Sequence, residues 1–139
     1  MGKVTDAGID VSKDVLDVAV RRADARCETA RFANDAGGHK KLVGWLTKGR
    51  GAVRVVLEST GTYSLDVALA LHRARDVAVM VANPRAIKQF TGALMQRSKT
   101  DVTAAVALQE FASRMPFVAW APPSAPVLEL RGWRGGSPR

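Results

Sequence analysis

The chain is 139 residues long, a length that predicts one domain with room for a tail but not for two full cores. Lysine and arginine number 21 against 13 aspartates and glutamates, so the formal net charge of +8 favours nucleic acid or another anionic partner. The single cysteine, Cys27, excludes an internal disulfide framework and a cysteine-only zinc site. No apolar run is long enough for a membrane span and no signal-peptide core opens the chain, so a cytoplasmic protein without a membrane partner is expected.

Three strands are predicted first. Val4–Asp10 is a short apolar run, and Val15–Arg21 alternates between apolar and polar residues as a half-buried strand does. Arg26–Phe32 predicts a weaker third strand. Because the connections between these segments are tight, the three strands are expected to form an antiparallel meander.

The period of the apolar residues then changes to that of a helix. Asn34 or Asp35 can cap this helix, whose apolar positions follow the i, i+3, i+4 spacing. Val53–Leu57 predicts a fourth strand, and Glu58 follows it directly. A second helix is predicted by one apolar face, which comprises Leu65, Ala68, Leu69 and His72.

The remaining elements complete two strand–helix–strand units. Val77–Val81 is apolar at every position, which predicts a parallel strand buried on both faces. Pro84 can open a third helix, and Ser98 is expected to begin a last helix that carries Asp101. A three-strand meander followed by βαβ units is the order of an α/β, ribonuclease-H-like mixed sheet with helices on its faces.

The domain boundary is predicted from composition. The ribonuclease-H-like core is expected over about residues 3–113 and the domain over 3–118. Residues 119–139 are interpreted as an extended, disordered tail, because four of the six prolines and three closing glycines fall there.

Three acids are the informative residues. Asp10 and Glu58 lie where the first and fourth strands end, and Asp101 lies at the start of the predicted last helix. If the first and fourth strands are neighbours, the acids converge at one end of the sheet, where like charges repel unless a cation is present. Mg²⁺ or Mn²⁺ is the expected cofactor, since two hard cations can support phosphodiester chemistry.

Each acid also has an ordinary structural interpretation. An aspartate after a strand, such as Asp10, often caps a turn. Glu58 can interact with the N-terminus of the next helix, and Asp101 occupies the third position after Ser98, as in a capping box.

Basic residues flank the acids and are candidates for binding phosphate, although a solvated helix face explains the same pattern. These candidates are Lys13, Arg85, Lys88, Arg97 and Lys99. His39 and His72 are interpreted as exposed or half-buried helix residues, and Trp45 and Phe90 as core residues rather than base-stacking platforms.

Short motifs in a fixed order carry a family resemblance. They are Gly-Ile-Asp-Val-Ser-Lys-Asp at 8–14, Phe32-x-Asn34 with Gly38-His39 and Trp45-Leu46, Val56-Leu57-Glu58-Ser59-Thr60-Gly61-x-Tyr63, Val81-x-Asn83-Pro84-Arg85 with Phe90, and Ser98-Lys99-Thr100-Asp101 with Glu110-Phe111-Ala112. In these motifs, over about residues 7–131, the chain resembles the DEDD-type, bridge-RNA-guided transposases of the insertion sequence 110 family.

The resemblance implies an N-terminal domain similar to the Holliday-junction resolvase RuvC, in which four acids hold Mg²⁺ beside the DNA strand to be cut. It also implies a structured guide RNA, a homo-oligomer, and a separate domain with a serine nucleophile. Carried over residue by residue, the catalytic and metal-binding acids are Asp10, Glu58 and Asp101. The fourth acid is expected three residues after Asp101, but Ala104 stands there and cannot bind metal, so weak metal binding is expected.

A second departure from the family is the ending, where Arg131 is followed by a Gly-rich stretch and Ser137 is not a credible nucleophile. The chain is therefore expected to be a truncated catalytic-domain fragment of a DNA transposase, inactive alone. The alternative is a nucleic-acid-binding remnant without chemistry. A third interpretation, an actin-like ATPase lobe, is disfavoured because residues 12–14 lack the glycine of a phosphate hairpin.

Overall fold

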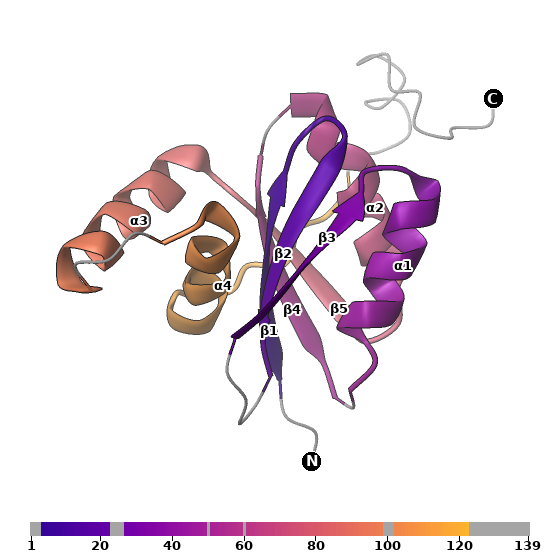
Figure 1. Cartoon of the computed structure of the whole chain (residues 1–139), viewed down its shortest axis with the longest axis horizontal. Helices are drawn as coiled ribbons and strands as arrows, with labels where there is room; N and C mark the ends of the chain where they lie inside the picture. The colour runs from indigo at the N-terminus through magenta and orange to yellow at the C-terminus, as the bar shows by residue number, and fades with distance from the viewer. Residues whose placement is uncertain (1–3, 23–26, 50, 60, 99–101, 123–139) are drawn as a thin grey trace.

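The structure is a computed structural model that describes residues 4–22, 27–49, 51–59, 61–98 and 102–122. Three strands come first, followed by alternating helices and strands and a final pair of helices, as predicted (Figure 1). The elements are β1 (Thr5–Val11), β2 (Val15–Arg21), β3 (Cys27–Ala33), α1 (Ala36–Leu46), β4 (Val53–Glu58), the 3₁₀ turn η1 (Gly61–Ser64), α2 (Leu65–Arg73), β5 (Val77–Ala82), α3 (Pro84–Ser98) and α4 (Ala104–Arg114).

The strands form one mixed sheet in the order β3-β2-β1-β4-β5. The first three strands pair antiparallel, whereas β1 pairs parallel with β4 and β4 parallel with β5. The prediction that the first and fourth strands are neighbours is therefore confirmed. This architecture is consistent with the predicted ribonuclease-H-like fold.

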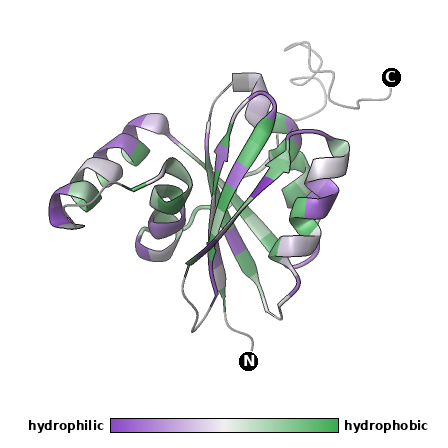
Figure 2. Cartoon of the chain, in the orientation of Figure 1, coloured by the Kyte–Doolittle hydropathy of each residue, from purple (hydrophilic) through white to green (hydrophobic). Residues whose placement is uncertain are grey.

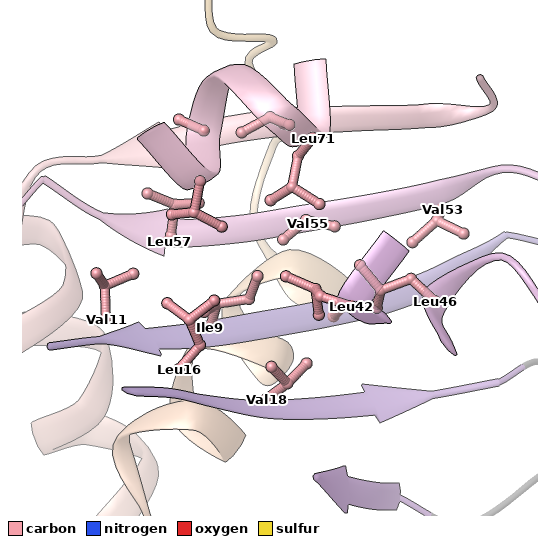
Figure 3. Packing of buried hydrophobic residues seen from close by; sticks show 14 of the residues in the cluster. Ile9, Val11, Leu16, Val18, Leu42, Leu46, Val53, Val55, Leu57 and Leu71 are labelled. Carbon is pink, nitrogen blue, oxygen red and sulfur yellow. The ribbon is translucent and has the colours of Figure 1, made fainter. Parts of the chain in front are cut away.

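Helices cover both faces of the sheet, with α1 and α2 on one face and α4 on the other (Figure 1). α3 lies outside α4, farther from the sheet, and Figure 2 shows hydrophilic residues along it, whereas the strands are mostly hydrophobic. The larger core lies under α1 and α2, where the branched side chains of β1, β2 and β4 meet Leu42, Leu46 and Leu71 (Figure 3).

The face under α4 is held by a smaller apolar cluster and a close backbone approach. Val56, Leu108 and Phe111 are members of the cluster. At Gly8 a β-carbon would overlap backbone atoms of Ala105, Leu108 and Gln109. Glycine is therefore required on β1 for α4 to lie this near to the sheet.

The first turn of α1 also depends on a close approach. Asp35 is the N-cap, and its carboxylate accepts a hydrogen bond of 2.7 Å from the Gly38 N–H. A β-carbon at Gly38 would overlap the carbonyl oxygen of Ala33, the last residue of β3. Glycine at this position lets the helix begin directly beside the end of the strand.

The predicted start of the last helix is wrong. Ser98 is the last residue of α3, and α4 begins at Ala104, six residues later. The N-cap is Thr103, whose hydroxyl accepts a hydrogen bond of 3.3 Å from the Val106 N–H. Serine and threonine are both good N-capping residues, so the sequence pattern alone did not distinguish Ser98 from Thr103. The helix begins after Thr103. Asp101 lies outside the described residues.

The predicted burial of the last strand is also wrong. β5 is an edge strand, and only Val79 and Ala82 in it are buried. The edge is partly covered by the segment that follows α4, since the Trp120 N–H donates to the Val79 carbonyl at 2.7 Å. The Trp120 ring also packs edge-on to His72 of α2, with 6.0 Å between centroids. Of the predicted tail, residues 123–139 lie outside the described residues.

Candidate metal and nucleic-acid site

Asp10 and Glu58 lie at the same edge of the sheet, near the ends of two neighbouring parallel strands. Ile9 of β1 pairs with Leu57 of β4, so the next residue on each strand is one of the acids. Side chains alternate along a strand, so both acids share the face of Gly8, which is the face that α4 covers. The topology brings these two predicted site residues together, while the third, Asp101, is not described.

A third carboxylate stands directly opposite Asp10. The antiparallel register pairs Asp10 with Asp17 of β2, and residues opposite one another point to the same face. Arg31, on β3, pairs in turn with Asp17, and its Nε and Nη2 atoms donate to the two carboxylate oxygens at 2.7 and 3.4 Å. This side-on ion pair is exposed and compensates the charge of Asp17.

Partial burial and one neighbouring negative charge raise the pKa of each acid. Partial burial raises the pKa of the Asp10 carboxyl, and the negative charge of Asp17 raises it further. Partial burial likewise raises the pKa of Glu58, with the charge of Asp10 as the second cause. Asp10 as a residue is exposed, so these effects act on a carboxyl that solvent can still reach. The site thus gathers negative charge that a cation would stabilise.

A hollow of about 420 Å³ lies between these strands and the start of α4. Its lining includes Asp10, Asp17, Thr29, Arg31, Thr103 and Ala104. The N-terminus of a helix favours negative charge, so α4 directs a positive dipole end at the same hollow. A larger hollow, of about 570 Å³, lies between α1 and α2 on the opposite face. Asp10 lines the smaller hollow and not the larger one, and Glu58 lines neither, so size alone does not locate this site.

The residues present fit a hard divalent cation in part. Asp10 and Glu58 supply oxygen ligands, and Mg²⁺ in phosphate chemistry commonly binds through one or two carboxylates together with waters and substrate phosphate. Among the residues that the structure describes, no group of three histidine, cysteine or acidic side chains is arranged to hold a metal. The three-acid metal centre therefore stays a prediction, with two of its members side by side on neighbouring strands.

The basic candidates are spread over a wider region. Lys13 is exposed in the turn between β1 and β2, three residues after Asp10. Arg85 is exposed in the first turn of α3, where its backbone N–H donates to the Oδ1 atom of Asn83 at 2.7 Å. Lys88 and Arg97 are exposed farther along α3, a helix of 15 residues and so about 20 Å long. Lys99 lies outside the described residues.

Sequence reasoning missed two residues of the smaller hollow, Asp17 and Arg31. The alternation of β2 placed Asp17 on its polar face, but only the register shows that Asp17 opposes Asp10 and pairs with Arg31. If the strands on either side of the tight turn after Asp10 had been assumed to form a hairpin, this pairing could have been found.

The prediction that His39 is exposed or half-buried is wrong, since it is 8% exposed. His72 is exposed, and Trp45 packs against the larger core.

The strand order is consistent with the ribonuclease-H-like class. A family model described as a transposase, that of the DEDD-type transposases of the insertion sequence 110 family, matches residues 7–135. The chain therefore belongs to this transposase family, as its motifs predicted. Membership implies interaction with DNA and suggests use of a divalent metal. None of the curated proteins matches the chain. No helix within the described ranges is long and apolar enough to cross a membrane.

Proposed function

We propose that this chain is the RuvC-like catalytic domain of a DNA transposase and that Asp10, Glu58 and Asp101 are its metal ligands. The observation that carries the proposal is the placement of Asp10 and Glu58 on adjacent parallel strands, on one face and at one edge. Asp10 and Glu58 would hold a divalent ion there, which would supply charge neutralisation for a DNA phosphate and activation of a water for attack on the phosphodiester. The carboxylates orient the bound group, and the start of α4 closes one side of the hollow.

Divalent-ion binding tests the metal site directly. In an NMR titration with Mn²⁺, we expect the amides next to Asp10 and Glu58 to broaden together at low ion concentration. Asp10→Asn keeps the size of the side chain and removes one ligand charge, so it should weaken this binding. Glu28→Gln, at the start of β3, is the matched control and should leave it unchanged. Broadening confined to surface acids elsewhere would contradict the site.

Ala104 supports the proposal that the chain alone cuts DNA poorly. Ala104 lines the same hollow as Asp10, and the family pattern calls for a fourth carboxylate at this position. A catalytic centre needs its ligands held closely, so one missing ligand loosens it. Incubation with branched and linear DNA, Mg²⁺ and Mn²⁺ is expected to show no strand cleavage or joining. Robust cleavage that disappears in Asp10→Ala would overturn the inactivity and make the chain a nuclease in its own right.

Nucleic-acid binding is proposed to use the outer face of α3. Over Pro84–Ser98 the helix has three cations and no acid, and it starts at the edge of the sheet that carries Glu58. Each phosphate contact contributes about 0.9 to the slope of log affinity against log salt. The double variant Arg85→Ala/Lys88→Ala should therefore weaken binding to DNA of any sequence and reduce that slope by about 2.

A matched control removes the same charge from the opposite face. Arg73→Ala/Arg75→Ala lies in and just after α2, where both side chains are exposed. We expect this variant to keep most of the affinity and salt dependence. Equal losses in the two double variants would show that net charge, rather than α3, carries the binding.

The second candidate function is nucleic-acid binding without chemistry, and Ala104 is the residue that favours it. If DNA binds with the expected salt dependence but no divalent ion reaches Asp10 and Glu58, this second function replaces the first. A structured guide RNA and a homo-oligomer, both implied by the family resemblance, stay predictions. Binding of the family's guide RNA and the mass of the chain in solution test them.

A further inference from the structure

One side-chain amide connects the segments that follow the two acids. The Nδ2 group of Asn34 donates to the carbonyl of Ser12 at 2.8 Å and to the carbonyl of Tyr63 at 3.1 Å. Ser12 comes two residues after Asp10, and Tyr63 comes five residues after Glu58. A single amide thereby joins the β1–β2 turn to the η1 turn, which lie at the same edge of the sheet (Figure 1).

The backbone of Asn34 strengthens this connection. Its N–H donates to the carbonyl of Asp14 at 2.9 Å, so the β1–β2 turn is bound to Asn34 twice. Asn34 directly follows β3, and its position is therefore set by the pairing of β3 with β2. The residue is anchored to the sheet and reaches out to both turns.

The orientation of the amide follows from its partners. Two carbonyl oxygens face Nδ2, and reversing the amide would place its oxygen against both of them. The Oδ1 atom of Asn34 therefore faces His39, whose Nε2 lies 2.8 Å away. Because Oδ1 can only accept, His39 must carry a proton on Nε2.

His39 is held in place by its own surroundings. It lies in α1 and is 8% exposed. The close approach at Gly38 puts the first turn of α1 against Ala33, which brings the imidazole beside Asn34. The imidazole is thus a fixed donor that prevents the Asn34 amide from rotating.

We propose that Asn34 and His39 form a positioning pair that sets the separation of Asp10 and Glu58. The inference rests on the proposed metal site and assigns to these two residues the task of building it. Asn34 touches neither carboxylate. It acts through the turns that follow them, and His39 acts through Asn34. Supporting groups behind metal ligands commonly change metal affinity by about 10–100-fold when they are removed.

A spectroscopic measurement tests the pair without any metal. Ring ¹⁵N shifts of His39 at neutral pH distinguish the Nε2–H from the Nδ1–H tautomer. We expect Nε2–H to dominate in the wild-type chain and the preference to weaken in Asn34→Ala. A dominant Nδ1–H tautomer in the wild-type chain would overturn the proposed network.

Mn²⁺ binding, followed by broadening of the amides next to Asp10 and Glu58, tests the consequence. We expect Asn34→Ala and His39→Leu to raise the dissociation constant by about tenfold. His39→Gln should restore binding close to the wild-type value, because the glutamine amide can donate to Asn34 in place of Nε2. Thr47→Val is the matched control, since it removes one hydrogen bond of 2.7 Å at the other end of α1.

The outcomes separate this inference from the function on which it rests. If the wild-type chain shows no Mn²⁺ effect at Asp10 and Glu58, the proposed metal site fails. If the wild-type chain binds and folded Asn34→Ala binds equally well, the positioning pair fails. Should Asn34→Ala not fold, His39→Leu against His39→Gln decides the point, because both keep Asn34 and its two carbonyl partners.

Discussion

The two faces of the sheet are held together by different means. Under α1 and α2, side chains such as Ile9, Leu57 and Leu71 are fully buried and interlock in one large apolar cluster (Figure 3). Under α4 the apolar cluster is smaller, and the helix is fixed by the backbone contact at Gly8 and by polar side chains. Because it buries more apolar side chains, the α1–α2 face is expected to contribute more to stability, whereas the α4 face determines what stands beside Asp10.

The polar contacts of α4 show how this second face is adjusted. Asp6 accepts from Arg54 at 2.9 Å and from the Ser113 hydroxyl at 3.1 Å. Glu110 pairs with Arg21 of β2 at 3.2 Å and with Arg114 on its own helix at 2.9 Å. Hydrogen bonds and ion pairs are directional, so they fix the rotation and height of α4 where apolar packing alone would tolerate small shifts. These contacts fix the position of α4 as a whole, and with it the helix start that lines the hollow beside Asp10.

The largest expected effect comes from opening a cavity in the apolar face. Leu42→Ala removes a fully buried side chain from α1 and should lower the free energy of unfolding by about 3 kcal/mol. Urea unfolding followed by circular dichroism measures the loss. Leu94→Ala, at a half-buried position on α3, is the control and should cost clearly less. A similar loss in both variants would contradict the assignment of stability to the α1–α2 face.

The next effect comes from adding one carbon to the α4 face. Gly8→Ala forces α4 away from β1, because its β-carbon would overlap backbone atoms that cannot rotate aside. We expect a loss of about 1–3 kcal/mol in unfolding free energy and shifted amide signals for Thr103 and Ala104. Gly44→Ala in α1, where nothing lies within 4 Å of the new carbon, should instead stabilise by about 0.5–1 kcal/mol. Unchanged signals at the start of α4 in Gly8→Ala would disprove the close approach.

The third prediction restores the acid that the family pattern calls for. Ala104→Asp puts a carboxylate into the hollow that Asp10 lines, at the first position of α4, where the helix dipole favours negative charge. The Mn²⁺ dissociation constant should fall by about tenfold, which corresponds to about 1.4 kcal/mol. Ala104→Asn supplies the same shape without the charge and should change the affinity less. Calorimetry measures all three chains, and an unchanged affinity in Ala104→Asp would remove Ala104 from the site.

The fourth prediction concerns the like charges across β1 and β2. Asp17→Asn removes the neighbouring charge that raises the pKa of Asp10, so the pKa of Asp10 should fall. It should not return to its ordinary value, because partial burial is the larger cause and remains. A carboxyl ¹³C titration of Asp10 measures the change. A pKa that rises in the variant would show that the Asp17–Arg31 pair acts on Asp10 as a net positive group.

The smallest effect is a pH dependence of stability from the α1 side. Burial lowers the pKa of His39, although the charges of Asp66 and Asp35 act in the opposite sense. The unfolded chain then binds the proton more readily than the folded one, so stability is complete above about pH 6.5. It should decline as the pH falls from there through the lowered pKa. The unfolding free energies of His39→Gln and the wild-type chain, compared between pH 7 and 5, isolate the contribution of His39. Identical pH profiles would exclude that contribution.

Local patterns in the sequence were sufficient for the order of elements and for expecting Asp10 and Glu58 at one edge of the sheet. Alternation along Val15–Arg21 and the helical spacing of Leu42, Trp45 and Leu46 act over a few residues, so they survive without tertiary context. The acids after apolar strands were visible for the same reason. Local rules failed at the start of the last helix, where both Ser98 and Thr103 are good N-capping residues.

By itself, the sequence predicted the order of elements along the chain through its apolar runs and periods, and the family through its motifs. Tertiary structure alone decided which side chains meet at the edge of the sheet. Register put Asp17 opposite Asp10, and the amide of Asn34 found partners in two turns that are 51 residues apart, at Ser12 and Tyr63. Such contacts depend on distances between segments far apart in the chain, which periodicity does not encode. β5 shows the same principle. Its sequence is apolar throughout, which predicted burial, but its place at the edge of the described sheet leaves it only partly buried.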